Sequence, residues 1–383
     1  MRHRSGIALV CLALVSCKQS TALKVGVINS MTGPQAPIGE SITNGIKLAQ
    51  QDLKQKGVEV QLVWEDDTGK PQIGLSALEK LATRDNVAGV VGAYTSAVTS
   101  AVAKAAERYK VPLVNPVASK EEITRQGYKW FYRVSAMTTD YAAILLDMAL
   151  TLGQPKTIGI LTENTDFGIS GAKSAHAYAV EKGLTVVFEE AYSQGSPDYR
   201  STLAQLKAKN PDVVFMVSYV ADAVLLMRQA REVGLSPQAF LGAGAGFSTA
   251  QFAKETDISN GVFSSTQWTS AVKWPGAQDF ADRYQKAYHT EATYHAATAY
   301  ASMMILGETA ARAGGDREKI RAALDAGKWD GIDGEVKFEE YGGYTHQNHH
   351  QMLVEQVQAG KHVTVWPEKF ATGKPLWPFP GWK

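Results

Sequence analysis

Hydroxyl-bearing residues directly follow two apolar strand-like runs in the first half of the chain. Tyr94-Thr95-Ser96 comes after Val87–Ala93, and Ser119 closes the segment that follows Val111–Val114. Ligands of open α/β sheets bind at the carboxyl ends of the strands. Each segment also precedes a predicted helix, so each hydroxyl can simply cap that helix. Taken together, the two serines, their backbone N–H groups and two helix N-termini are suited to bind one anion, such as a carboxylate.

Two aromatic residues occupy corresponding positions in the second half of the chain. Phe167 lies shortly after the strand-like run Thr157–Leu161, and Tyr219 follows Asp212–Ser218. Both therefore lie at the ends of strands, where ligands bind in open α/β sheets. They can equally belong to the rim of a hydrophobic core.

Motifs for catalysis, cofactor binding and metal binding are missing or incomplete. The sequence contains no Gly-x-Ser-x-Gly, His-Glu-x-x-His, Walker loop or Cys-x-x-Cys. Gly242–Gly246 follows a strand, but Phe247 stands where a dinucleotide loop needs its last glycine. His346, His349 and His350 have no adjacent ligand to complete a zinc site, which favours a solvated or hydrogen-bonded loop. We therefore expect a binding protein without cofactor or metal, with an α/β enzyme as an alternative.

The first residues have the layout of an export signal. Two arginines precede the apolar stretch Gly6–Leu14, which is too short to span a bilayer of ~30 Å. The Leu-Val-Ser-Cys ending at Cys17 resembles a bacterial lipobox, after which the cysteine is lipidated. We predict a signal peptide over 1–16, a lipid on Cys17 and a tether over 17–22. An ordinary signal peptide with a chance cysteine is the alternative; either way the protein is exported to the periplasm or the cell surface.

The composition describes a soluble globular protein with more than one core. With 383 residues, 45% apolar residues and 20% charged residues, two domains are the natural expectation. The net charge of +1 and the lack of a basic run argue against a nucleic-acid partner. The only cysteines are Cys11 and Cys17, so the mature fold contains no disulfide bond.

Predicted strands and helices alternate in two consecutive series. The first begins with the strand Leu23–Asn29, and the second begins with the helix Tyr141–Leu152. Two such series predict two doubly wound, Rossmann-like α/β lobes. The less regular final third is expected to return to both lobes. The predicted division assigns 23–139 and 268–342 to the first lobe, and 140–267 and 343–383 to the second.

The order and spacing of several motifs carry a family resemblance over some 300 residues. These motifs include MTGPQAPIGESITNGIKLAQQDL, GAYTSAVT, VPLVNPVAS, TENTDFGISGAKSA and GEVKFEEYG. The chain resembles the leucine/isoleucine/valine-binding family, the substrate-binding proteins of ABC importers for branched-chain amino acids and amides. The resemblance implies a type I periplasmic-binding-protein clamshell with three crossovers, which closes on its ligand by hinge motion. It further implies a monomer that delivers the ligand to a permease and ATPase complex; a ligand-sensing domain of a signalling system is the alternative.

The resemblance also assigns roles to individual residues. It places Ser96 and Ser119 at the ligand carboxylate, the Val117 backbone carbonyl beside them, Tyr94 and Thr95 next to the ligand side chain, and Phe167 and Tyr219 over it.

Two positions depart from the pattern for amino-acid ligands. Gly244 stands where an acidic residue would pair with the ligand α-ammonium, and Ile38 replaces an aromatic residue. A buried ammonium without a counter-charge costs about 3–5 kcal/mol, by analogy with broken buried ion pairs. Asp222 is an alternative source of this charge, although its position in the sequence does not place it in the site. We therefore expect a carboxylate with an apolar or aromatic body, or an amide, in place of an ordinary α-amino acid.

Overall fold

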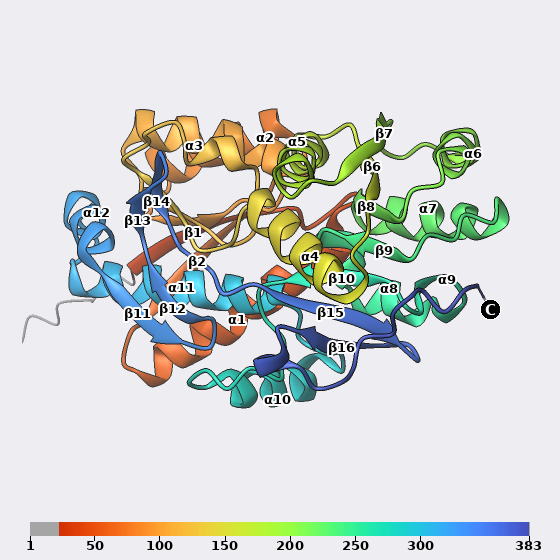
Figure 1. The fold of residues 1–383 in the computed structure, drawn as a ribbon. Helices are drawn as coiled ribbons and strands as arrows, with labels where there is room; N and C mark the ends of the chain where they lie inside the picture. Colours follow the sequence, from red (N-terminus) through yellow and green to blue (C-terminus); the bar gives the residue numbers. More distant parts are fainter. Residues whose placement is uncertain (1–22, 383) are drawn as a thin grey trace, which may run out of the picture.

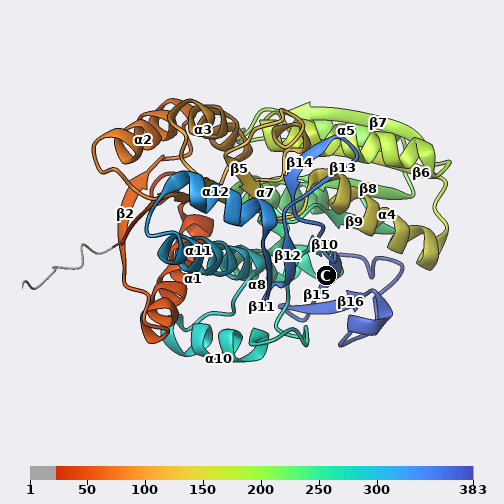
Figure 2. The ribbon, with the colours of Figure 1, turned by 90° about the vertical axis from the view of Figure 1, so that its left-hand side faces the viewer.

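The computed structural model describes residues 23–382, and the apolar runs predicted as strands form two separate sheets of seven strands each. Figures 1 and 2 show the sheets side by side, with helices packed around each of them. The prediction of two doubly wound α/β lobes is therefore confirmed. The signal peptide, Cys17 and the tether lie outside the described residues.

The first sheet has the strand order β13-β14-β5-β4-β3-β1-β2, and its strands β1 to β5 are parallel. Short strands such as β3 are buried throughout, because helices cover both faces of a doubly wound sheet. The seven strands are β1 (Leu23–Asn29), β2 (Val60–Asp66), β3 (Val90–Gly92), β4 (Leu113–Asn115), β5 (Phe131–Arg133), β13 (Glu339–Tyr341) and β14 (Tyr344–Gln347).

Helices α2 and α3 pack together on one side of this sheet, and α1 and α11 pack together on the other (Figure 1). The two helices α1 and α11 approach closely because position 45 is a glycine: a Cβ atom there would lie 2.2 Å from the carbonyl oxygen of Ala296. The helices of this lobe are α1 (Ala36–Gln55), α2 (Pro71–Thr83), α3 (Ser96–Tyr109), α10 (Ala277–Tyr288), α11 (Tyr294–Arg312) and α12 (Arg317–Ala326), with the 3₁₀ turn η1 (Glu121–Ile123) and the hairpin β11 (Lys328–Gly331) and β12 (Gly334–Lys337).

The second sheet has the strand order β16-β15-β10-β9-β8-β6-β7. Its strand β15 pairs antiparallel with both β10 and β16, so β15 alone runs against the other strands. Its strands are β6 (Thr157–Glu163), β7 (Thr185–Tyr192), β8 (Val213–Val217), β9 (Ala239–Gly242), β10 (Phe263–Thr266), β15 (Leu353–Gln358) and β16 (Lys361–Trp366). Its helices are α4 (Thr138–Gly153), α5 (Asp166–Glu181), α6 (Arg200–Ala208), α7 (Val220–Glu232), α8 (Ala250–Lys254) and α9 (Thr256–Ser259), with the 3₁₀ turns η2 (Ala245–Ser248) and η3 (Glu368–Phe370).

Three segments, 134–137, 267–276 and 348–352, carry the chain between the lobes. Side-chain amides tie these segments to one another. Gln267 Oε1 accepts from the Ala136 N–H at 2.7 Å, and Asn348 Nδ2 donates to the Val134 carbonyl at 3.0 Å. The three crossovers therefore form one hydrogen-bonded hinge.

One strand lies in a different sheet from the one that we predicted. We expected residues from 343 onward to join the second lobe, whereas β14 pairs with β5 in the first sheet. β14 makes a single registered residue pair with β5, Gln347 with Arg133. Its sequence Tyr-Thr-His-Gln has little apolar pattern that could assign it to either sheet. Within residues 23–382, no helix combines the length and apolarity needed to cross a membrane.

Candidate ligand-binding site

Nine residues from the two lobes enclose a small cavity between them. Six of these residues were predicted from the sequence, and all six are buried. The cavity holds only about 10 Å³, which is roughly the space of one water molecule. The lining residues are Tyr94, Ser96, Val117, Ala118, Ser119 and Tyr294 from the first lobe, and Phe167, Tyr219 and Ala245 from the second.

The start of α3 forms one wall of the cavity. Thr95 is the N-cap of α3, and its hydroxyl accepts from the Val98 N–H at 3.3 Å. Thr95 is buried but does not line the cavity, because its hydroxyl serves as this cap. Ser96 is the first residue of the helix, and its Oγ accepts from the Lys120 N–H at 3.2 Å. This bond holds the two serine-bearing loops against each other.

The segment after Ser119 differs from the prediction. We expected an α-helix to begin there, but only the three-residue 3₁₀ turn Glu121–Ile123 follows. So short a turn has no aligned stack of peptide dipoles and gives Ser119 no positive helix end. The expectation of two helix N-termini is therefore wrong, and α3 supplies the only one of the pair.

The second lobe closes the cavity with aromatic rings. The Tyr94 and Tyr219 ring centroids lie 5.7 Å apart at an interplanar angle of 67°, and Phe167 lies 5.6 Å from Tyr219. The Tyr219 hydroxyl lies beside the Ser96 backbone amide, and burial raises the pKa of the Tyr219 phenol well above its usual value. The cavity of about 10 Å³ is too small for a ligand of several atoms, so binding one requires the rings to move apart.

Tyr294, which the sequence pattern did not point to, occupies the space beside Gly244. A Cβ atom on Gly244 would lie 3.1 Å from the Tyr294 hydroxyl, and Gly244 has a left-handed φ of +59°. Tyr294 Oη accepts from the Ala245 N–H at 3.1 Å and is hydrogen bonded to Tyr141. The space beside Gly244 therefore contains the hydroxyl groups of Tyr294 and Tyr141.

Two buried carboxyl groups of the second lobe, those of Asp222 and Glu163, do not line the cavity. Asp222 accepts from the Tyr199 hydroxyl at 2.9 Å and from the Gly195 N–H at 3.1 Å, and it is not among the residues that line the cavity. Glu163 is fully buried and accepts from the Tyr219 N–H at 3.2 Å and the Thr165 hydroxyl at 3.1 Å. Burial raises the pKa of Glu163 to about 8, so at neutral pH this group is mostly uncharged.

Ile38 does not line the small cavity that contains most of the other predicted residues. It lines a separate cavity of about 330 Å³ between the lobes, together with Thr249 and His295. His295 separates this outer cavity from the inner one, because its ring stacks on Tyr294 at 3.8 Å and meets Tyr94 edge-on at 6.1 Å. Burial lowers the pKa of His295 to about 3, so the ring is neutral.

Ion pairs join the lobes on one side of the cavity. Lys120 pairs with Asp166 at 2.7 Å, and Glu122 pairs with Lys173 at 3.1 Å. Both pairs are partly exposed, so each contributes little by itself. These ion pairs and the contact between the buried Tyr94 and Tyr219 rings show that the two lobes are closed against each other in this structure.

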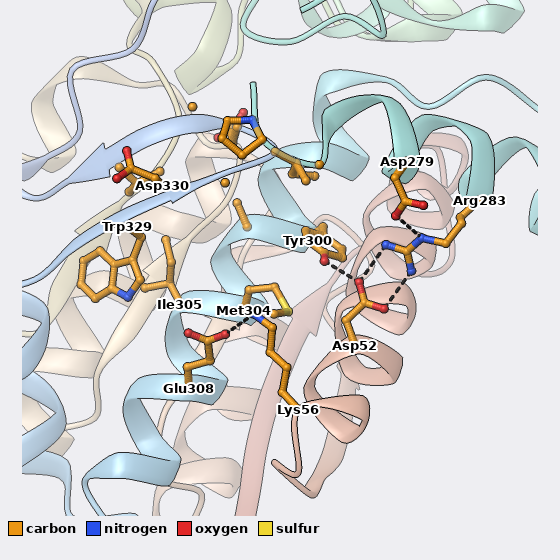
Figure 3. A pocket seen from close by; sticks show the side chains of 18 residues that line it. Asp52, Lys56, Asp279, Arg283, Tyr300, Met304, Ile305, Glu308, Trp329 and Asp330 are labelled. Atoms are coloured by element: carbon orange, nitrogen blue, oxygen red, sulfur yellow. Dashed lines mark hydrogen bonds and ion pairs between the residues drawn. The ribbon is translucent and has the colours of Figure 1, made fainter. Parts of the chain in front are cut away.

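A further cavity of about 350 Å³ lies wholly in the first lobe, between α1, α10, α11 and the β11–β12 hairpin (Figure 3). Both of its basic side chains are paired: Arg283 binds Asp52 through two contacts of 2.8 Å, and Lys56 binds Glu308 at 2.7 Å. None of the predicted site residues lines it. These pairs tie α1 to α10 and α11 and leave no unpaired basic group for an anionic ligand.

The histidine group has structural contacts. His350 is buried and lies 3.0 Å from Asp333, and the His346 ring stacks on Tyr132 at 4.4 Å. Within residues 23–382, no group of three or more His, Cys, Asp or Glu side chains is arranged to hold a metal ion.

Comparison with known proteins agrees with this geometry. The family model described as "Periplasmic binding protein" matches residues 22–362. A Leu/Ile/Val-binding protein homolog 8 of Brucella suis is 31% identical over 402 residues, covering 96% of this chain and 96% of that protein. This similarity extends over nearly the whole length of both chains.

Solved structures have the same fold. A leucine-binding protein from Thermotoga maritima superimposes with a TM-score of 0.82 at 24% identity, covering 90% of this chain and 98% of its own. A solute-binding protein of an ABC transporter from R. palustris, solved in complex with benzoate, superimposes with a TM-score of 0.81 at 21% identity. The match covers 90% of this chain and 95% of that protein. The chain therefore belongs to the periplasmic binding protein family and is related over nearly its whole length to a Leu/Ile/Val-binding protein homolog.

Proposed function

We propose that this protein is the lipid-anchored substrate-binding protein of an ABC importer and that it captures a small carboxylate without an α-ammonium group. The observation that carries the proposal is the lining of the interlobe cavity. Ser96 and Ser119 face Phe167 and Tyr219 across it, and none of the nine lining residues is acidic. Hydroxyls and the N-terminus of α3 favour an anion, whereas an ammonium has no counter-charge there.

The relatives support this class of ligand. The R. palustris protein binds benzoate, an acid without an ammonium group, and the T. maritima protein is named for leucine. The neutral hydroxyls beside Gly244 in this chain favour an acid without an ammonium group over an α-amino acid such as leucine. The aromatic side chains of Tyr94, Phe167 and Tyr219 offer stacking surface to a flat or apolar body.

Replacing the two serines tests the anion site. A hydrogen bond to a charged group is worth ~1.5–3 kcal/mol, so Ser96→Ala and Ser119→Ala should each weaken binding of an acid about tenfold or more. Isothermal titration with 4-hydroxybenzoate measures this loss. Ser76→Ala is the matched control, because the exposed Ser76 hydroxyl on α2 also makes one hydrogen bond, to Gln72. If both alanine variants bound the acid with wild-type affinity, the assignment of Ser96 and Ser119 to the anion site would be wrong.

The lipid anchor on Cys17 holds the protein beside the permease to which it delivers its ligand. Several acyl chains on one cysteine anchor a protein firmly, whereas a single chain anchors it marginally. Wild-type cells should incorporate labelled palmitate into the protein, and Cys17→Ser should abolish the label. Cys11→Ser is the internal control and should keep it; equal labelling of the Cys17 variant would exclude the anchor.

A further inference from the structure

A buried arginine lies directly behind the loop that carries Ser119. Arg133 ends β5, and its side chain is fully buried. Its Nη1 donates to the carbonyls of Ala118 at 3.3 Å and Lys120 at 2.6 Å. Because these two residues flank Ser119, the guanidinium holds the loop on both sides of the predicted anion-binding residue.

All the acceptors of this guanidinium are neutral oxygen atoms. Besides the two carbonyls, its Nη2 donates to Thr124 Oγ1 at 2.6 Å and its Nε to Gln347 Oε1 at 2.6 Å. Asp140 on α4 acts on the guanidinium through space, but it accepts its hydrogen bond from the Met137 N–H. Among residues 23–382, Arg133 therefore has hydrogen bonds but no direct ion pair. A buried positive charge without an ion pair is stabilised by any anion that binds nearby.

The peptide groups of the loop extend this charge toward the cavity. In a trans peptide the N–H points opposite to the carbonyl, so the Ser119 N–H points away from the guanidinium that binds the Ala118 carbonyl. The peptide between Lys120 and Glu121 is oriented in the same way. Its carbonyl accepts from Arg133, and its N–H, on Glu121, donates to Ser170 Oγ of the second lobe at 3.2 Å. Ala118 and Ser119 both line the cavity. The cation thus orients peptide dipoles with their positive ends away from itself.

We propose that Arg133 is a positioning residue that supplies the fixed positive charge behind Ser119, in place of the helix N-terminus that is missing there. This inference rests on the proposed binding of a carboxylate between Ser96 and Ser119. Arg133 does not touch the ligand; it orients the loop and stabilises an anion through it. The residue also joins two crossovers through Gln347, so a purely structural role must be distinguished by experiment.

A pair of probes with nearly the same shape and different charge makes this distinction. Isothermal titration should compare 4-hydroxybenzoate with 4-hydroxybenzamide in the wild type, Arg133→Gln and Arg133→Lys. In Arg133→Gln, the acid should lose at least tenfold more affinity than the amide. In Arg133→Lys, which keeps the charge, the ratio of acid to amide affinity should stay within about threefold of the wild-type ratio.

Arg317 provides the control variant. It also donates to backbone carbonyls, those of Val87 at 2.9 Å and Ala82 at 3.0 Å, but it lies away from the cavity. Arg317→Gln should lower the melting temperature without changing the affinity ratio. The inference would be overturned if Arg133→Gln lost equal affinity for the acid and the amide. It would also be overturned if the ratio of acid to amide affinity in Arg133→Lys fell more than about threefold below the wild-type ratio. A wild type that binds neither probe would instead contradict the proposed function, and the inference with it.

Discussion

Deaminated acids should bind this protein at least 100-fold more tightly than the corresponding α-amino acids. Leaving an ammonium buried without a counter-charge costs about 3–5 kcal/mol, and each 1.4 kcal/mol is a factor of ten in affinity. None of the nine residues that line the cavity is acidic, and the Tyr294 hydroxyl lies beside Gly244, 3.1 Å from where a Cβ atom would be. An acid without the ammonium avoids this cost.

Isothermal titration of two matched pairs measures this preference. Leucine is compared with 4-methylpentanoate, and phenylalanine with 3-phenylpropanoate, so that each pair differs by the amino group. Tight binding of leucine with no response to the deaminated acid would refute the prediction. In that event Glu163→Gln identifies the hidden counter-charge: it should abolish leucine binding if the buried Glu163 carboxylate supplies it.

The stability of the second lobe should fall as the pH rises from about 5 to 8, and Glu163 should cause much of this fall. Burial raises the pKa of Glu163 to about 8 from its ordinary 4.5. Between these values the folded protein binds a proton that the unfolded chain has released. The stabilising contribution is therefore complete below pH 4.5 and is lost as the pH rises through 8, at up to ~1.4 kcal/mol per pH unit.

Melting temperatures measured between pH 5 and 9 test this dependence. The melting temperature of the wild type should drop by several degrees over this range, since ~1 kcal/mol shifts a protein of this size by about 2–4 °C. Glu163→Gln keeps an acceptor for the Tyr219 N–H but does not titrate, so its curve should be flatter. Glu181→Gln, at an exposed glutamate on α5, should keep the wild-type slope. A slope in Glu163→Gln equal to that of the wild type would show that another buried acid is responsible.

Local patterns were sufficient to predict the fold and the edge where the site lies. Runs such as Val213–Val217 are apolar at every position, and such runs form central strands of a parallel sheet because both faces are covered. The carboxyl ends of these strands meet at one edge, which explains why Ser96, Ser119 and Tyr219 come together as predicted. These inferences depend on spacing within a few residues, which is visible in the sequence itself.

Contacts between distant parts of the chain decided the rest. Tyr294 meets Gly244 from a helix some 50 residues away, and Arg133 reaches Gln347 across 214 positions. The helix expected after Ser119 is replaced by a short turn with an arginine behind it. Which side chain fills a given space depends on how the lobes and crossovers pack, and packing at such separations leaves no periodic signal in the sequence. The sequence by itself therefore determined the fold and the gathering of the candidate site residues at one cavity, whereas the tertiary structure decided which charges and hydroxyl groups surround that cavity.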